Sequence, residues 1–305
     1  MKQILTGTLL GLALSLALPM TDAHGQIEKL LAKGATVQKV ADGFKFTEGP
    51  VADKEGNVYF TDQPNNKIMK YSTGGELTVF HDNPGRANGM YFDPQEKLIT
   101  CSDEDNELWA FEMDGTHTVI LTDQEGKHFN GPNDLWIAPD GGIFFTDPLY
   151  KRPWWEGRRS MEKEKEGQHV YYLAKGSKTP RAIETNLKQP NGIFGIAASN
   201  TLFVADIGDG KTYQYTYQDD GTLTNRTVFA AMGSDGMTVD QKGNVYLTGK
   251  KGVTVYNKKG EEIGVVEIPA NWTANVCFGG KEMKTLFITS MDGLYAIEMK
   301  VTGLR

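Results

Sequence analysis

The chain has 305 residues and a formal net charge of −7, with 39% hydrophobic and 23% charged residues. This balance excludes an intrinsically disordered chain, and the acidic charge argues against a nucleic-acid partner, whose phosphates require clustered Lys and Arg. The length allows one large domain or two ordinary ones, and 35 glycines spread along the chain indicate many turns and an all-β architecture.

Residues 1–23 have the pattern of a signal peptide. Lys2 provides a positive start, residues 4–18 form a short apolar stretch, and residues 21–23 offer small side chains for cleavage. The stretch is too short to span a membrane comfortably, and no later stretch is long and apolar enough to do so. We therefore expect an exported protein, periplasmic or secreted; an ordinary N-terminal helix is the alternative interpretation.

Residues 24–305 carry a sixfold repeat and are predicted to form a single domain. Each repeat has a β-branched or aromatic run of strand length, preceded in most cases by a turn and a second apolar run. The six runs begin at Asn57, Lys97, Gly142, Thr201, Asn244 and Thr285. Strands repeating every 40–45 residues or so, roughly the length of one blade, predict a six-bladed β-propeller with a central channel. Residues 35–40 are expected to add an outer strand to the last blade and close the ring.

Two further features stand out along the chain. Residues 151–168 form an insertion with Trp154, Trp155 and mixed charges. Long loops in compact domains are often functional, so the insertion is either a lid or substrate wall, with Trp154 as a candidate substrate contact, or a solvated excursion. Cys101 and Cys277 are the only cysteines. Export permits a disulfide, but their apolar surroundings favour two buried free thiols.

An oxygen-bearing side chain stands where the first strand of every repeat begins. The six residues are Glu48, Asn88, Asn133, Asn191, Asp235 and Asn275. Each lies 10 or 11 residues ahead of the first apolar residue of the second strand. Because the first strands of a propeller line its channel, the six side chains would converge on one axis. Oxygen donors of mixed charge favour Ca²⁺ or Mg²⁺, and the absence of cysteine and histidine from the set weighs against structural zinc.

Turn formation is the competing interpretation of the same residues. Asn88, Asn191 and Asp235 each precede a glycine, and Asn-Gly and Asp-Gly pairs commonly form turns. Glu48 does not fit this alternative because glutamate is not a turn former, and Asn133 is followed by an aspartate rather than a glycine. A cation site is the preferred interpretation, and turn chemistry stays open.

Four motifs resemble those of the regucalcin/gluconolactonase family of six-bladed propellers. In chain order they are residues 46–50, 130–134, 189–192 and 234–237. Residues 145–148, together with the Trp-rich insertion, are similar to bacterial gluconolactonases. The resemblance implies one divalent cation, often Ca²⁺, with Mg²⁺, Mn²⁺ or Zn²⁺ as alternatives. It places Glu48, Asn191 and Asp235 as ligands and Asn133 as a further ligand or a substrate contact, and it gives Asn88 and Asn275 no metal role.

The implied activity is metal-dependent hydrolysis of a sugar lactone. A bound cation would polarise the ester carbonyl and lower the pKa of a bound water. Asp235 and Asn133 are the expected catalytic residues, Asp235 as ligand and general base and Asn133 orienting the ester. Asn88, His128 and Asn275, with Trp154, are the candidate substrate contacts.

Two other functions remain open at this point. One is hydrolysis of another activated ester, such as a phosphotriester, and the other is a non-catalytic ligand-binding propeller. Animal members of the family carry an arginine two residues ahead of the position of Asn133, where this chain has Gly131. Sugar contacts made by that arginine cannot be carried over, so the identity of the lactone is open too.

Overall fold

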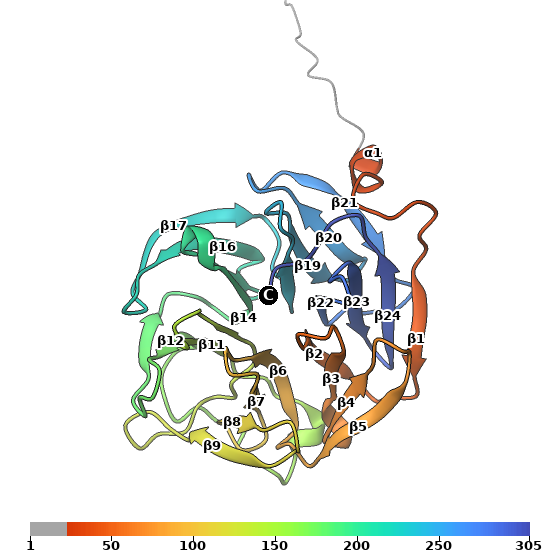
Figure 1. Ribbon diagram of the computed structural model, residues 1–305. Helices are drawn as coiled ribbons and strands as arrows, with labels where there is room; N and C mark the ends of the chain where they lie inside the picture. Colours follow the sequence, from red (N-terminus) through yellow and green to blue (C-terminus); the bar gives the residue numbers. More distant parts are fainter. Residues whose placement is uncertain (1–22) are drawn as a thin grey trace, which may run out of the picture.

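The protein is a six-bladed β-propeller, as the repeat predicts. A computed structural model describes residues 23–305, so the candidate signal peptide lies almost wholly outside the described residues and stays a prediction. Six four-stranded antiparallel sheets stand around one axis (Figure 1). The short helix α1 (Ala23–Ile27) precedes them, and among residues 23–305 no helix has the length and apolar character needed to cross a membrane.

The strands of each blade are given in order from the innermost to the outermost. The first contains β2 (Thr47–Ala52), β3 (Val58–Asp62), β4 (Lys67–Tyr71) and β5 (Leu77–Asp82). The second contains β6 (Ala87–Phe92), β7 (Leu98–Ser102), β8 (Glu107–Phe111) and β9 (His117–Leu121). The third contains β10 (Leu135–Ile137), β11 (Ile143–Asp147), β12 (His169–Leu173) and β13 (Arg181–Glu184). The fourth contains β14 (Pro190–Ile196), β15 (Thr201–Asp206), β16 (Lys211–Tyr217) and β17 (Leu223–Ala230). The fifth contains β18 (Met237–Val239), β19 (Val245–Gly249), β20 (Gly252–Tyr256) and β21 (Glu262–Glu267). The sixth contains β22 (Asn275–Gly279), β23 (Thr285–Ser290), β24 (Gly293–Glu298) and β1 (Gln38–Asp42). Three short 3₁₀ helices are η1 (Gln63–Asn65), η2 (Pro153–Trp155) and η3 (Ala197–Ser199).

The ring closes between the two ends of the described chain. The N-terminal strand β1 pairs antiparallel with β24 and so becomes the outer strand of the sixth blade. The predicted closing strand is confirmed, displaced a few residues toward the C-terminus from residues 35–40. Pairing covers the backbone donors and acceptors of β24 that would otherwise form an exposed sheet edge.

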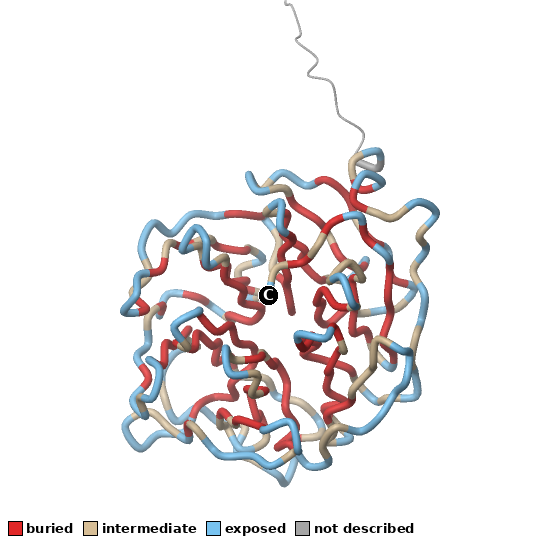
Figure 2. The backbone as a smooth tube through the Cα atoms, viewed as in Figure 1, coloured by how far each residue is buried: buried red, intermediate tan, exposed pale blue. Residues whose placement is uncertain are grey.

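Burial follows the distance of each strand from the axis (Figure 2). Every residue of β3 is buried, whereas no residue of the outer strand β5 is fully buried. Because both faces of a second strand pack against neighbouring blades, its sequence is a continuous apolar run rather than an alternating one. Cys101 and Cys277 are buried thiols in different blades, Cys101 in β7 and Cys277 in β22.

The two ends of the channel differ. The end where the second strands begin opens into a cavity of about 320 Å³ whose lining includes Met90, Trp136, Phe194 and Leu304. The C-terminal tail lies across this end, where the backbone NH of Leu304 donates to the carbonyl of Val239 over 2.8 Å (Figure 1). The other end is where all six inner strands begin, and the predicted ring of oxygen donors belongs to it.

Candidate metal centre at the channel mouth

Five of the six predicted ring residues stand at one level of the channel. They are Glu48, Asn88, Asn133, Asn191 and Asp235, and none is more than 5% exposed. Neighbouring inner strands touch there, since the backbone NH of Gly89 donates to the carbonyl of Asn133 over 2.7 Å. The repeated strand geometry therefore brings equivalent positions of separate blades to a shared axis, as the sequence predicts.

The loops that lead into this ring are held by aspartates at the ends of second strands. Asp62 Oδ1 accepts the backbone NH of Lys45 over 3.1 Å, and Asp206 Oδ1 accepts that of Gln189 over 2.8 Å. Asp147 does the same for Gly131 over 2.9 Å. Each bond fixes the backbone two or three residues ahead of a ring residue. The side chains of the ring consequently start from a rigid base.

The predicted position of Asn275 is wrong by one residue. In the third and fifth blades, the residue after the ring residue donates its backbone NH to a threonine hydroxyl, from Asp134 to Thr146 and from Gly236 to Thr248. In the sixth blade Asn275 itself makes this bond, to Thr289 over 3.1 Å. The ring level of this blade is therefore Ala274. The hairpin between β22 and β23 is longer than its counterparts, and equal spacing along the sequence no longer gives equal height in the channel.

Asn275 belongs instead to the next layer of the channel, where it lies beside Asp134. The amide of Asn275 lies over Gly236, where a Cβ would come within 2.0 Å of it. Asp134 occupies the corresponding space over Gly89, at 2.4 Å from an added Cβ. Its two oxygens accept the backbone NH groups of Leu135 and Ile193, and burial raises its pKa to about 7. This layer forms a polar floor beneath the ring.

Asn191 and Asp235 are joined directly at the centre. Asn191 Nδ2 donates to Asp235 Oδ1 over 2.6 Å and to the Tyr150 hydroxyl over 2.7 Å. Trp272 Nε1 donates to the other oxygen of Asp235 over 2.7 Å. Both hydrogens of the Asn191 amide are thereby used. Its oxygen, Oδ1, is buried and has no hydrogen-bond partner among the described residues, which leaves an acceptor without a donor.

Two buried carboxylates, Glu48 and Asp235, belong to the same cluster. Burial raises the pKa of Glu48 well above its usual range, and the nearby charge of Asp235 raises it further. Burial also raises the pKa of Asp235, against the opposing effects of Trp272, Arg152 and Asn191. Buried carboxylates with raised pKa values are stabilised in the charged form by a cation placed between them.

The donor set fits a hard divalent cation. Residues 23–305 contain no group of three His, Cys, Asp or Glu side chains placed to hold a metal ion. A cation here would therefore rest on the two carboxylates together with the amide oxygens of Asn191 and Asn133. Calcium accepts such mixed carboxylate and amide oxygens readily, and two carboxylates balance its charge.

The remaining candidates are placed less uniformly. The side chains of Asn88 and Asn133 form no hydrogen bond with any described residue, so their amides are free to bind a ligand. Trp154 is half-buried on the insertion, with its ring 6.2 Å from that of Phe46. His128 is exposed, and only its backbone NH is engaged, with Glu164. The structure does not bring the His128 side chain to the ring.

Tyr150, Arg152, Asp134 and Trp272 were not predicted as site residues. Asp134 directly follows Asn133, and Tyr150 and Arg152 stand at the start of the insertion, so proximity to predicted features was the available signal. Trp272 carries no such signal, because it lies 37 residues from Asp235 in an inter-blade loop. Its role depends on the path of that loop.

Comparison with known proteins gives a consistent result over nearly the whole propeller. The family model for the "SMP-30/Gluconolactonase/LRE-like region" matches residues 46–292. The gluconolactonase of Zymomonas mobilis is 25% identical over 93% of this chain and 87% of its own. A crystal structure provisionally called a gluconolactonase is 34% identical, with a TM-score of 0.85 over 92% of this chain and 97% of its own. The structure of the gluconolactonase of Xanthomonas campestris is 25% identical, with a TM-score of 0.82 over 90% of this chain and 92% of its own.

Two more distant similarities extend to proteins with other names. The diisopropyl-fluorophosphatase of Loligo vulgaris is 24% identical over 83% of this chain and 88% of its own. A calcium-binding regucalcin from Agrobacterium tumefaciens has 19% identity and a TM-score of 0.71 over 87% and 94%, a likeness of fold alone.

Proposed function

Because the chain belongs to the SMP-30/gluconolactonase/LRE-like family, we propose that it is a metal-dependent lactonase that hydrolyses a sugar lactone. The observation that carries the metal-dependent part is the unpaired, buried oxygen of Asn191 beside two carboxylates of raised pKa, Glu48 and Asp235. Such a cluster is unfavourable by itself and becomes favourable once a divalent cation joins it.

Glu48, Asn191, Asp235 and Asn133 would hold one divalent cation, most readily Ca²⁺. When bound, the cation polarises the ester carbonyl and stabilises negative charge on its oxygen. The two hydrogen bonds from Asn191 and Trp272 fix the carboxylate of Asp235 in one orientation. A fixed carboxylate is suited to remove a proton from an attacking water.

The proposed reaction consumes one water molecule for each lactone that is opened. Asp235 takes one proton as the water oxygen bonds to the carbonyl carbon. The bond between that carbon and the ring oxygen then breaks, and the ring oxygen leaves as a hydroxyl after accepting the proton. The product is an open-chain hydroxy acid. Asn133 and Asn88, whose amides have no other described partner, would orient the lactone, and Trp154 would form part of the wall beside it.

The direct test is hydrolysis of glucono-1,5-lactone with Ca²⁺ and with EDTA. Wild-type protein should open the lactone faster than buffer only when the cation is present. Asp235→Ala should lower kcat/KM by at least about 10³-fold, since it removes both a ligand and the base. Asp219→Ala, which changes an exposed aspartate of an outer hairpin, is the matched control and should retain full activity. Full activity in EDTA, or in Asp235→Ala, would refute the proposal.

One relative supports a second candidate reaction. The similarity to a diisopropyl-fluorophosphatase favours hydrolysis of an activated phosphorus compound, a phosphorofluoridate or a phosphotriester, as the alternative activity at the same centre. Measuring paraoxon and diisopropyl fluorophosphate beside the lactone separates the two. A kcat/KM that is higher for a phosphorus ester would replace the lactone as the substrate. A propeller that only binds ligands would turn over none of them.

We also propose that the protein is exported. The support is the pattern of residues 1–23 in the sequence, with its positive start and short apolar stretch. Cell fractionation, with mass spectrometry of the mature N-terminus, tests this directly. Cleavage after residue 23 is expected, and an intact Met1 in the cytoplasm would contradict it.

A further inference from the structure

The insertion of residues 151–168 is anchored to the propeller by a few side chains, although most of its residues are exposed. It connects β11 to β12 at the end of the third blade nearest the ring. Trp155 is 0% exposed, and the side chain of Arg159 is 5% exposed. Burial of a tryptophan and an arginine requires fixed partners, so the insertion has a built interface with the blades beneath it.

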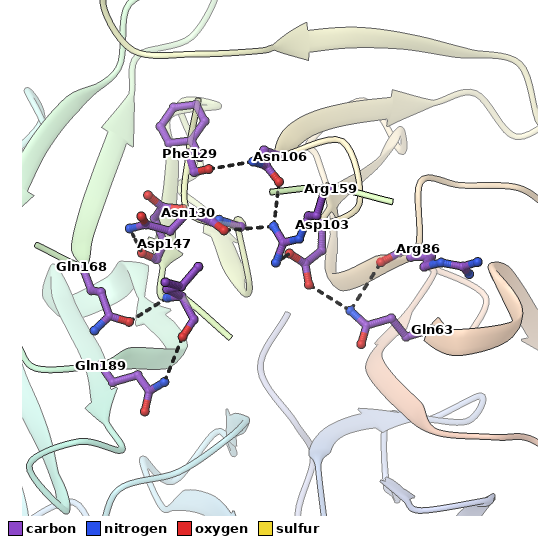
Figure 3. A network of polar contacts seen from close by, with 12 residues as sticks. Gln63, Arg86, Asp103, Asn106, Phe129, Asn130, Asp147, Arg159, Gln168 and Gln189 are labelled. Carbon is purple, nitrogen blue, oxygen red and sulfur yellow. Dashed lines mark hydrogen bonds and ion pairs between the residues drawn. The ribbon is translucent and has the colours of Figure 1, made fainter. Parts of the chain in front are cut away.

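Arg159 is the main anchor of the insertion (Figure 3). Its guanidinium lies 3.0 Å from Asp103 and donates to the carbonyl of Asn130 over 2.9 Å and to Asn106 Oδ1 over 2.6 Å. A Cβ at Gly131 would lie 2.7 Å from Arg159 Nη1, so a side chain at position 131 would displace the guanidinium. The insertion therefore brings an arginine into the space that Gly131 leaves open.

The segment that carries the insertion into place is also held at its start. Gln168 Oε1 accepts the backbone NH of Leu149 over 2.6 Å, and Gln189 Nε2 donates to its carbonyl over 3.4 Å (Figure 3). Lys165, further along, lies 3.8 Å from the centre of the Phe129 ring and 3.8 Å from Asp147 Oδ2. Residues just after Leu149 are consequently fixed over the channel mouth.

Arg152 is one of these fixed residues, and it packs on the aromatic side chain that contacts the ring. Its guanidinium carbon lies 4.4 Å from the centre of the Tyr150 ring, whose hydroxyl accepts the hydrogen bond from Asn191. The same carbon lies 5.7 Å from the Trp154 ring. The positive charge lowers the pKa of both Glu48 and Asp235, so its field reaches the candidate metal centre.

Arg152 also lacks the partner that comparable residues of the insertion have. Three basic residues of the insertion are not exposed: Arg152, Arg159 and Lys165. Arg159 pairs with Asp103, and Lys165 pairs with Asp147. Across residues 23–305, Arg152 has neither an ion pair nor a side-chain hydrogen bond. A half-buried guanidinium with its donors free is suited to bind a carboxylate by two parallel hydrogen bonds.

We propose that Arg152 binds a carboxylate on the sugar chain of the substrate, so that the site prefers lactones of sugar dicarboxylic acids over neutral aldonolactones. This specificity rests on the proposed lactonase function. Arg152 contacts the face of the Tyr150 ring, whereas Asn191 contacts its hydroxyl end. Arg152 is thus displaced from the ligand ring, and the group it meets is a substituent rather than the reacting carbonyl.

The test compares two lactones that differ only in that substituent, glucaro-1,4-lactone with a carboxylate at C6 and glucono-1,4-lactone with a hydroxymethyl group. Wild-type protein loaded with Ca²⁺ should show a kcat/KM at least about tenfold higher for the carboxylate lactone. Arg152→Met, which keeps the apolar stem, should lose this preference mainly through KM, with the neutral lactone changed less than about threefold. Arg158→Met is the matched control, since Arg158 is an exposed arginine of the same insertion.

A binding measurement separates this specificity from the lactonase activity itself. Calorimetry with the open-chain products at equal free Ca²⁺ should give about tenfold tighter binding of glucarate than of gluconate to wild type. Arg152→Met should remove the difference, and Arg158→Met should keep it. Equal losses for both lactones in Arg152→Met, or equal binding of glucarate and gluconate to wild type, would overturn the proposal. If neither lactone is hydrolysed but glucarate binding depends on Arg152, the lactonase function fails and the carboxylate site stands.

Discussion

Two buried polar clusters lie at the same end of the propeller and differ in how their charges are balanced. In the insertion anchor, formed by Asp103, Arg159 and Gln63, the carboxylate lies 3.0 Å from a guanidinium and accepts a hydrogen bond from Gln63 over 3.2 Å. In the candidate metal centre, Glu48 and Asp235 have no ion-pair partner within the described chain. Only the more distant charge of Arg152 opposes theirs.

The difference separates a structural cluster from a ligand site. A buried carboxylate is costly unless a positive charge and hydrogen bonds accompany it. The anchor supplies both from the chain, so its purpose is to hold the insertion. The centre supplies hydrogen bonds but not the positive charge, and it keeps the Asn191 oxygen unpaired. Residue types alone do not distinguish these clusters, since both contain buried acids and amides.

Replacing Arg159, the positively charged side chain of the insertion anchor, should change the stability of the protein the most. Arg159→Met leaves Asp103 buried without its partner, and the free energy of unfolding should fall by about 3–5 kcal/mol. Arg158→Met removes an exposed ion pair with Glu104, 3.5 Å long, and should cost less than about 1 kcal/mol. Urea denaturation of both variants measures this. Equal losses would mean that the anchor is not a balanced pair.

Binding of Ca²⁺ at the candidate metal centre should give the next largest change in stability. Ca²⁺ at a hundredfold excess over its Kd should stabilise wild type by about 3 kcal/mol relative to EDTA, because it binds only the folded protein. Glu48→Gln should lose most of this increment, while Arg159→Met should retain it from a lower baseline. Thermal unfolding with and without Ca²⁺ is the measurement. An increment unchanged in Glu48→Gln would place the cation elsewhere.

The pH dependence of the anchor should be smaller. Burial raises the pKa of Asp103 to about 6, although Arg159 and Arg152 oppose the shift. An unfolded aspartate has a pKa of about 3.9, so the folded protein holds this proton more tightly. The contribution of Asp103 to stability is full below the unfolded pKa and is lost as pH rises through about 6, and between pH 4 and pH 7 it falls by about 2 kcal/mol.

Asp103→Asn should remove that pH dependence. The variant leaves Arg159 unpaired and is expected to be less stable at neutral pH, but the offset from wild type should shrink as pH rises from 4 to 7. Other carboxyl groups titrate in both proteins and cancel in the comparison. The free energy of unfolding across this range gives the result, and a constant offset would show that Asp103 is already ionised at pH 4.

The smallest expected effect concerns the hydrogen bond that orients Asp235. Trp272→Phe removes the donor 2.7 Å from Asp235 Oδ2 while keeping the aromatic packing. We expect kcat to fall about tenfold with KM changed less than about twofold, which corresponds to one hydrogen bond to a charged group. Trp109→Phe, in the outer part of the second blade, should leave both unchanged. A large rise in KM instead would assign Trp272 to substrate binding.

Much of the centre was predictable because a propeller converts sequence position into radial position. Glu48, Asn191 and Asp235 recur at one place in the repeat, and the closed ring brings such places together. The same reasoning failed for Asn275, because two extra residues in the β22–β23 hairpin shift the register. Spacing counted along the chain measures height in the channel only when the intervening turns have equal lengths.

The sequence by itself determined the six blades, the closing strand and five of the six oxygen-bearing residues at the channel mouth. These features follow from local strand patterns and from their repetition along the chain, which brings equivalent positions of different blades together. Only the tertiary structure decided that Trp272 and Tyr150 bond to the centre, that Arg159 fills the space above Gly131, and that Arg152 has no ion-pair or hydrogen-bond partner among the described residues. Those contacts join loops of different blades, and the path of a loop depends on the surfaces it packs against rather than on its own pattern.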